Sequence, residues 1–552
     1  MKRHAREEFY VLGEGILTQE RGEPVCHRPS TAASLRKFRF SRLGPQGQPA
    51  SRRLIAKLAA AMTADVVDPE SDLNGAAPIP AGFTYLGQFL DHDLTMDATG
   101  VTLGTDVSVE ELLQGRSPAL DLDSLYGRGP RSADRIFYDS DGVSLKTGNT
   151  EPVRFPDART NVPLDGFDLP RRAIGSTHRD RRQPLIPDQR NDENLAIAQT
   201  HAAFIRFHNT VVRDLASGGV SGDQLFTMAR DRVVRHYQWM VRTDFLPRVV
   251  DRSIVEDVFT NGRKFFEVNP VPGDTPTMPI EFSVAAYRLG HSMVRKGYEW
   301  NRVFRDGGPG GQAGLFLLFV FTGLNGNFNP GAQLRDLDDP NSGTLDRLPT
   351  NWIADFRRLY DFTAAGNPAL VAPGGELNLA ERIDTLLVDP LAALPSGSFG
   401  GRGTGPIEEA ALQRNLAFRN LTRANMVKLA SGQELAAQFG LEALKPDQLL
   451  TGNGGAVLTD LTAEEETELT TRTPLWFYLL REAELNGGVL TGVGGRIVAE
   501  VFHRAIEGSR ISIVRDPFWR PTLGPTPGTF GMVELLRYAF DDRPELLNPL
   551  GD

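Results

Sequence analysis

Long helical patterns separated by long irregular connections most constrain how this chain can fold. Apolar residues recur with the spacing of amphipathic helices in six segments, namely 85–96, 193–215, 224–250, 282–296, 410–429 and 476–484. The stretches between them, such as 139–190 and 306–311, are rich in Pro, Gly and Asp, which is typical of long ordered loops. No internal repeat and no series of alternating strands is evident. The sequence therefore predicts a mainly α-helical protein with long loops and little β structure.

The length of 552 residues exceeds the size at which one hydrophobic core stops growing. Several domains would satisfy this length, and so would one large helical domain with long connections. We favour a single domain over residues 61–545, preceded by an N-terminal extension over residues 1–60. The extension carries clustered Arg and Lys and little apolar periodicity, so we assign it no chemistry.

Composition excludes several classes of protein. Hydrophobic residues make up 40% and charged residues 24% of the chain, which predicts a folded protein rather than a disordered one. The formal net charge of -10 argues against a general nucleic-acid binder, because neutralising phosphates requires a basic surface. Cys26 is the only cysteine, which excludes an intrachain disulfide and a cysteine-held iron–sulfur cluster. Nitrogen and oxygen ligands are therefore expected for any metal.

Neither a membrane span nor a conventional secretion signal is indicated. The first 18 residues lack a continuous apolar core of signal-peptide length. The most apolar run, residues 313–324, is too short to cross a bilayer and predicts a buried segment. The location therefore stays open between the cytoplasm and export by an unconventional route.

A short polar run stands within the first predicted helix. Gln88, Asp91, His92 and Asp93 lie among apolar residues. At about 100° per residue, Gln88 and His92 share one face of the helix, while the two aspartates point to either side of it. A surface helix with solvated acids would explain this pattern. Alternatively, side chains that point in three directions from one short helix could contact three different groups.

Oxygen-bearing groups alternate in a later segment, residues 117–127. Ser117, Asp121 and Asp123 follow a spacing by which an extended loop can wrap a hard cation. A turn with solvated aspartates is the simpler interpretation when this segment is considered alone.

The stretch 79–93, Ile-Pro-Ala-Gly-Phe-Thr-Tyr-Leu-Gly-Gln-Phe-Leu-Asp-His-Asp, resembles the distal helix of the animal-type haem peroxidases. This is the myeloperoxidase-like family of the peroxidase–cyclooxygenase superfamily, and the chain resembles its bacterial members. The resemblance implies a haem b cofactor, with His92 as the distal base and Gln88 as a hydrogen-bonding neighbour in the distal cavity. It also implies that Asp91 is a haem ester partner and that Asp93 binds calcium. Histidine suits proton transfer near neutral pH.

The segment 117–127 resembles the calcium loop of the same family. The resemblance implies ligands from Ser117, the Ala119 carbonyl, Asp121 and Asp123, completed by Asp93. The family often has Thr at the first of these positions and Ser at the last, so Asp123 adds a charge. A tighter site or a slightly different geometry is therefore expected.

Residues 189–194 open the second long helix, where acids in a first turn could simply be helix caps. The following Arg-Phe-His-Asn at 206–209 resembles the family's Arg-Glu-His-Asn, with Phe207 as the departure. The resemblance makes Arg190 the distal arginine and Glu193 the second haem ester partner, both facing the haem. Asn194 follows Glu193, so a methionine sulfonium link is not expected, which argues against efficient chloride oxidation.

The proximal side resembles the family in Arg-Leu-Gly-His at 288–291. The resemblance makes His291 the axial iron ligand and Arg288 a propionate partner. Asn420 corresponds to the asparagine that accepts a hydrogen bond from the proximal histidine, and Arg423 to a further propionate contact. Taken alone, His291 is typical of a core histidine, and Arg423 is typical of a polar helix face. No partner motif surrounds four further histidines, which we interpret as structural or surface residues: His178, His201, His236 and His503.

The expected function is a haem peroxidase that reduces hydrogen peroxide through a ferryl intermediate and oxidises small organic donors, halides or pseudohalides, as in a response to oxidative stress. A haem fatty-acid dioxygenase of the same fold is one alternative. It is disfavoured because Arg288 occupies the position of that group's radical tyrosine, and Tyr287 is expected to point elsewhere. A non-catalytic adhesion or scaffold module is the other alternative, disfavoured by the intact His92, Arg190 and His291.

Overall fold

Helices dominate the computed structural model, with 47% of the chain in helix and 6% in strand. The structure describes residues 38–64, 79–97, 99, 101–270, 275–329, 343–395 and 407–552, together with the backbone of three strands within residues 8–27. The predicted fold class, mainly α with little β structure, is confirmed. Among the described residues, no helix combines the length and apolarity needed to cross a bilayer.

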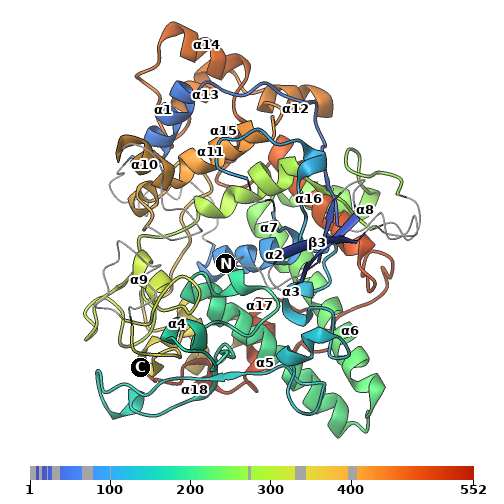
Figure 1. Ribbon diagram of the computed structural model, residues 1–552, viewed down its shortest axis with the longest axis vertical. Helices are drawn as coiled ribbons and strands as arrows, with labels where there is room; N and C mark the ends of the chain where they lie inside the picture. Colours follow the sequence, from blue (N-terminus) through green and yellow to red (C-terminus); the bar gives the residue numbers. More distant parts are fainter. Residues whose placement is uncertain are drawn as a thin grey trace.

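Helix α2 (Gly82–Leu94) lies in the middle of the molecule, between two groups of helices (Figure 1). One group contains α5 (Leu195–Ser217), α6 (Asp223–Met240) and α17 (Met532–Ala539). Asn194 caps α5 by accepting from the Ile197 amide at 3.0 Å. Helix α5 packs against α2, α6 and α17, and it is buried along most of its length because apolar residues occupy nearly every face.

The second group forms the other end of the molecule (Figure 1) and contains α1 (Arg52–Met62), α11 (Leu416–Met426), α12 (Gly432–Phe439), α15 (Leu475–Leu485) and α16 (Gly492–Gly508). Helix α1 packs against α11. The single helix predicted over 410–429 is divided into α10 (Ile407–Arg414) and α11. Asn415 causes the division, because its side chain caps α11 at the Phe418 amide.

Two other predicted helices are also irregular. The helix predicted over 224–250 consists of α6, a π turn over Val241–Phe245, and α7 (Leu246–Val249). Pro247 has no amide hydrogen to continue an α-helical ladder. The helix predicted over 282–296 is replaced by a π turn over Glu281–Ala285 and a 3-10 helix over Ala286–His291. Gly290 weakens α-helix formation there, so His291 sits at the end of a 3-10 helix.

The remaining helices are short: α3 (Asp123–Tyr126), α4 (His178–Arg181), α8 (Arg252–Asn261), α9 (Leu315–Val320), α13 (Pro446–Thr451), α14 (Ala463–Thr471) and α18 (Pro544–Leu547). Helix α9 falls in the apolar run 313–324, and most of its side chains are buried. That run is therefore part of the core, as its composition predicted.

In the described part of the chain, strands pair in four small sheets. The largest is antiparallel with order β1-β2-β3, over Glu8–Val11, Gly15–Glu20 and Glu23–His27. This sheet was not predicted, because the sequence showed no alternating polarity typical of strands. The other sheets are pairs of strands: β4 (Phe40–Ser41) with β7 (Met278–Pro279), β5 (Gly148–Asn149) with β6 (Asp165–Asp168), and β8 (Gly297–Tyr298) with β9 (Ala313–Gly314).

Candidate functional site

A cavity lies between α2 and the 3-10 helix over 286–291, and it collects most of the predicted site residues. Its walls include Gln88, Asp91, His92, Glu193, Arg288, His291, Asn420 and Arg423. Apolar side chains complete the lining, among them Phe83, Phe245, Leu315, Phe319 and Leu391. Residues that are more than 300 positions apart in the chain therefore meet at one site.

His92 is buried and neutral on the α2 wall. Its Nδ1 lies 2.8 Å from Oδ1 of Asn191, and its Nε2 lies 3.9 Å from a Glu193 carboxylate oxygen. Burial and the nearby Arg190 charge lower the pKa of His92 to about 3. A neutral imidazole at the cavity wall has one nitrogen able to accept a proton.

Asn191 and His201 belong to the surroundings of His92, although no sequence motif pointed to them. Asn191 lies on the 3-10 turn Gln189–Asp192, and its Nδ2 is 2.8 Å from Nδ1 of His201 on α5. Both side chains are fully buried. The one available signal was a histidine among the apolar residues of a long helix, which more often marks an ordinary core position.

Arg190 is held behind His92 and does not line the cavity. Its Nε and Nη2 donate to the Asp188 carboxylate at 3.0 and 2.7 Å, and Nη2 also donates to the His92 carbonyl at 3.0 Å. The expectation that this guanidinium faces the cavity is not met. It bonds instead to Asp188, which lies two residues earlier in the chain. Arg190 therefore contacts the backbone of His92 rather than the cavity.

Asp188 pairs with two arginines at once. Arg116 donates through Nε to Oδ2 at 2.7 Å, and the same oxygen accepts from Nη2 of Arg190. Burial alone would raise the pKa of Asp188, but the charges of Arg116 and Arg190 outweigh burial and hold that pKa well below its usual range. This carboxylate stays ionised and keeps both guanidinium groups in place.

Gln88 and Asp91 line the cavity from the turn of α2 that precedes His92. Asn194 donates through Nδ2 to Oε1 of Gln88 at 2.9 Å. The Thr95 hydroxyl donates to Asp91 at 2.8 Å, and Nη1 of Arg288 lies 3.8 Å from the same carboxylate. Glu193 lines the cavity as well, so both predicted ester partners are placed there.

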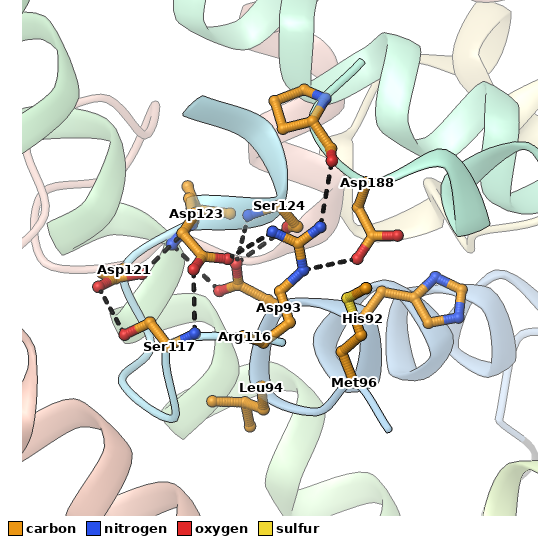
Figure 2. Close-up of polar contacts among 12 residues, drawn as sticks. His92, Asp93, Leu94, Met96, Arg116, Ser117, Asp121, Asp123, Ser124 and Asp188 are labelled. Atoms are coloured by element: carbon orange, nitrogen blue, oxygen red, sulfur yellow. Dashed lines mark hydrogen bonds and ion pairs between the residues drawn. The ribbon is translucent and has the colours of Figure 1, made fainter. Parts of the chain in front are cut away.

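Asp93, Asp121 and Asp123 form an acidic cluster next to the cavity. One carboxylate oxygen from each lies within 4.8 Å of the others. Figure 2 shows Asp93 pointing into this cluster, while the neighbouring His92 points away from it. Ser117 is part of the cluster, since its hydroxyl donates to Asp121 at 3.1 Å. The Ala119 carbonyl accepts from the Asp121 amide at 3.0 Å.

Asp93 is fully buried and surrounded by donors. Ser124 donates to it through its hydroxyl at 2.9 Å, and the Tyr237 hydroxyl and the Leu122 amide donate at 3.2 and 3.1 Å. Burial and the charge of Asp123 raise the pKa of Asp93 to about 7. A cation among these carboxylates would remove the repulsion that raises this pKa.

His291 lines the cavity from the 3-10 helix and is also neutral. Burial and the charges of Arg288, Arg423 and Arg419 lower its pKa to about 3. Asn420 contacts it, but Nδ2 rather than Oδ1 faces Nδ1 of His291, at 2.8 Å. The predicted acceptor role of Asn420 is therefore not the arrangement present, because an amide nitrogen can only donate. Rotating this amide by half a turn would exchange the two atoms.

Arg288, Arg419 and Arg423 bring three positive charges to the cavity lining. Burial and the Arg423 charge lower the pKa of Arg419 to about 10. Burial, together with the Arg288 charge, lowers the pKa of Arg423 as well. Charges that destabilise one another in this way favour a ligand that carries negative groups.

Tyr287 also lines the cavity, contrary to the expectation that it points elsewhere. Its ring stacks on Phe282 with centroids 4.7 Å apart, and its buried hydroxyl has no hydrogen-bond partner among the described residues. The 3-10 geometry of residues 286–291 differs from the α-helix on which the expectation rested.

Comparison with known proteins finds similarity to peroxidases over part of the chain. Residues 95–307 match the profile described as animal haem peroxidase. A peroxidase-like protein from Margaritifera margaritifera is 32% identical over 126 residues, which are 22% of this chain and 15% of that protein. Heme peroxidase 2 of Caenorhabditis elegans is 22% identical over 211 residues, or 36% of this chain and 26% of that protein. The aligned parts thus span about a quarter or less of these relatives.

Among solved structures, the Oryza sativa fatty acid alpha-dioxygenase aligns with 94% of this chain and 83% of its own chain. The TM-score is 0.51 at 12% sequence identity. This likeness shows a shared fold.

Proposed function

We infer the function of this chain from the premise that it belongs to the animal haem peroxidase family: it reduces hydrogen peroxide at a haem b bound in the cavity and oxidises a small organic donor, a halide or a pseudohalide. The observation that carries this inference is the placement of two neutral histidines, His92 and His291, on different walls of one cavity. One would serve as proton acceptor and the other as iron ligand.

The residues of the cavity fit a haem. Arg288, Arg419 and Arg423 would bind its two propionates, which would bring further negative charge to these three guanidinium groups. Gly290 leaves room beside His291, because a Cβ at this position would meet no atom within 4 Å. Rotation of the Asn420 amide would let Oδ1 accept from Nδ1 of His291 and leave Nε2 with a lone pair for iron.

Each distal residue has a defined part in this proposal. Bound haem supplies the iron at which peroxide is reduced. His92 accepts a proton from the peroxide and returns it to the leaving oxygen. Arg190 stabilises negative charge from behind His92, through its field rather than by contact. Gln88, held by Asn194, provides an amide that orients the oxidant in the cavity.

Two covalent links to haem belong to the same proposal. Asp91 and Glu193 both line the cavity, and each carries a carboxylate that would replace one hydrogen of a haem methyl group to form an ester, with hydrogen peroxide as the two-electron oxidant that is reduced to water. The Thr95 hydroxyl and the Arg288 guanidinium orient Asp91 for this reaction.

We further propose that calcium binds the acidic cluster. Asp93, Asp121 and Asp123 present hard oxygen donors close together, with Ser117 and the Ala119 carbonyl beside them. Such an ion would fix the end of α2 and hence the direction of His92.

The test is an absorption spectrum of haem-loaded protein, followed by rapid mixing with hydrogen peroxide. We expect a Soret band that shifts quickly on mixing, and a rate constant for this shift that falls by a factor of about 10² to 10⁴ in His92→Ala. His236→Ala serves as the control, because this buried histidine hydrogen-bonds to Arg232 and lies outside the cavity lining. A protein that binds no haem would support the scaffold alternative.

A fatty-acid dioxygenase is the second candidate, favoured by one observation, the Tyr287 hydroxyl in the cavity wall. It predicts oxygen uptake with linoleate that disappears in Tyr287→Phe. Haem binding without any peroxide reaction, together with that uptake, would replace the first proposal by the second.

A further inference from the structure

His92 begins a chain of hydrogen bonds that leads away from the cavity. Its Nδ1 meets Oδ1 of Asn191 at 2.8 Å, and Nδ2 of the same amide meets Nδ1 of His201 at 2.8 Å. The three side chains come from α2, from the turn Gln189–Asp192 and from α5. One amide group thus lies between two buried imidazoles.

The two ends of an asparagine amide are chemically distinct, so this chain has a direction. Oδ1 can only accept, which requires that Nδ1 of His92 carries hydrogen. A neutral imidazole with hydrogen on Nδ1 has its lone pair on Nε2. The lone pair of His92 is therefore on the nitrogen that is not engaged by Asn191.

His201 lies at the other end of the amide. Because Nδ2 of Asn191 can only donate, Nδ1 of His201 is the acceptor and Nε2 carries the hydrogen. His201 is fully buried, with the ring of Phe89 against it at 5.8 Å between centroids. Its Nε2 has no hydrogen-bond partner among the described residues. No described group hydrogen-bonds to Nε2 of His201, so Asn191 is the hydrogen-bond partner of this ring.

We propose that Asn191 and His201 are positioning residues that hold His92 in the tautomer with hydrogen on Nδ1, leaving the Nε2 lone pair available to take a proton in the cavity. The proposal rests on the peroxidase function proposed above. Neither residue lines the cavity, and both act through His92. With the opposite tautomer, His92 would present an N–H group where a proton acceptor is required.

His92 is buried, so neighbouring protein groups decide which of its ring nitrogens carries the hydrogen. Other contacts act on its backbone, namely the bond from Arg190 to its carbonyl. Near its side chain, Glu193 lies 3.9 Å from Nε2 and would attract a hydrogen on that nitrogen. The Asn191 bond opposes this attraction and keeps the hydrogen on Nδ1.

The experiment measures the tautomer directly in haem-loaded protein. In the diamagnetic ferrous carbon monoxide form, ¹⁵N-histidine labelling separates the protonated and bare nitrogens of each ring by NMR, and His92→Ala assigns the signals. We expect Nδ1–H for His92 in the wild type and in Asn191→Asp, which keeps an acceptor. In Asn191→Leu we expect Nε2–H to become populated and the rate constant for peroxide to fall about tenfold or more.

His208→Phe is the matched control. His208 is buried on the same helix, seven residues beyond His201, and bonds to Tyr126 and the Val143 carbonyl instead of Asn191. The control should leave the His92 tautomer unchanged, whereas His201→Phe should populate Nε2–H by freeing the Asn191 amide to rotate. His201→Phe also tests the proposal if Asn191→Leu does not fold.

Hydrogen on Nε2 of His92 in the wild type would overturn the proposal. So would a wild-type tautomer and a wild-type peroxide rate in both Asn191→Leu and His201→Phe. Failure of the peroxidase function is recognised separately, since the wild type would then bind haem and show the expected tautomer without reacting with peroxide.

Discussion

The two walls of the cavity differ in the charges that surround their polar groups. On the α2 wall, His92 is bonded to Asn191, and behind this wall Arg190 and Arg116 share the Asp188 carboxylate. On the wall that carries His291, burial and the Arg288 charge lower the pKa of Arg423, burial and the Arg423 charge lower the pKa of Arg419, and Asn420 presents a donor to His291 where the proposed iron ligation needs an acceptor. The first wall is organised before any ligand arrives, whereas the second is suited to a ligand that brings negative charge.

This difference has an energetic meaning. Preorganised groups stabilise a reaction without rearranging during it, which suits the wall proposed to handle protons. Buried like charges destabilise the protein until a counter-charge binds, which suits the wall proposed to hold an anionic cofactor. Substitutions on the two walls should therefore impair different properties of the protein.

The largest effect is expected for His291→Ala. Loss of the proposed axial ligand should abolish the Soret band of haem-supplemented protein, whereas His92→Ala should keep it and lose the peroxide reaction. Absorption spectra of both variants measure this contrast. His503→Ala is the control, because His503 is a buried histidine that contacts Arg263 and does not line the cavity. Equal loss of haem in the two cavity variants would break the comparison between the walls.

A smaller effect is expected from removing the proposed calcium ion beside the α2 wall. A chelator should lower the melting temperature, since an ion present at 100 times its Kd contributes about 2.7 kcal/mol to stability. Asp121→Asn should reduce this dependence on calcium, while the exposed Asp106→Asn should retain it. Differential scanning calorimetry with and without calcium measures the change. Identical melting of wild type and Asp121→Asn in both conditions would contradict the calcium proposal.

An effect of about the same size as that of calcium is expected for Glu482 on α15, a helix that packs behind His291. Burial raises the pKa of Glu482 from 4.5 to about 7, although the amides of Val493 and Gly494 donate to it. The unfolded chain releases this proton at lower pH than the folded one, so stability should fall as pH rises from about 4.5 to 7. The loss should reach about 3 kcal/mol above pH 7.

Urea unfolding of Glu482→Gln between pH 5 and pH 8 checks this expectation. The variant should show a flatter dependence of unfolding free energy on pH than the wild type, whatever its absolute stability. The exposed Glu110→Gln is the control and should keep the wild-type slope. An unchanged slope in Glu482→Gln would assign the pH dependence to other groups.

Sequence reasoning succeeded where neighbouring residues carry the information. The fold class and the resemblance to animal haem peroxidases followed from contiguous patterns, of which the run Gln88 to Asp93 is the most specific. Gln88, Asp91 and His92 of that run line one cavity together with residues 288–291. The roles of these residues stay predictions, as do the domain boundaries at 60 and 545.

What sequence reasoning missed depends on chain folding between distant segments. Asp188, which bonds to Arg190 two residues later, also accepts from Arg116 of another loop, and no local pattern encodes that second contact. The link from His92 through Asn191 to His201 joins three elements. The breaks at 241–245 and 281–291 were missed because the apolar residues of these segments keep α-helical spacing in the sequence, although the backbone forms π and 3-10 turns.

Asp188 bonds to two arginines, and this pairing restricts how the sequence can change during evolution. Arg116 bonds both to Asp188 and, at 3.1 Å, to Asp123 of the acidic cluster, as Figure 2 shows. A substitution at Asp188 would leave two buried guanidinium groups without this partner, and a substitution at Asp123 would change what Arg116 can hold. The acidic loop that contains Asp123 and the Arg190 segment thus form one epistatic unit, whose members are expected to vary together among relatives.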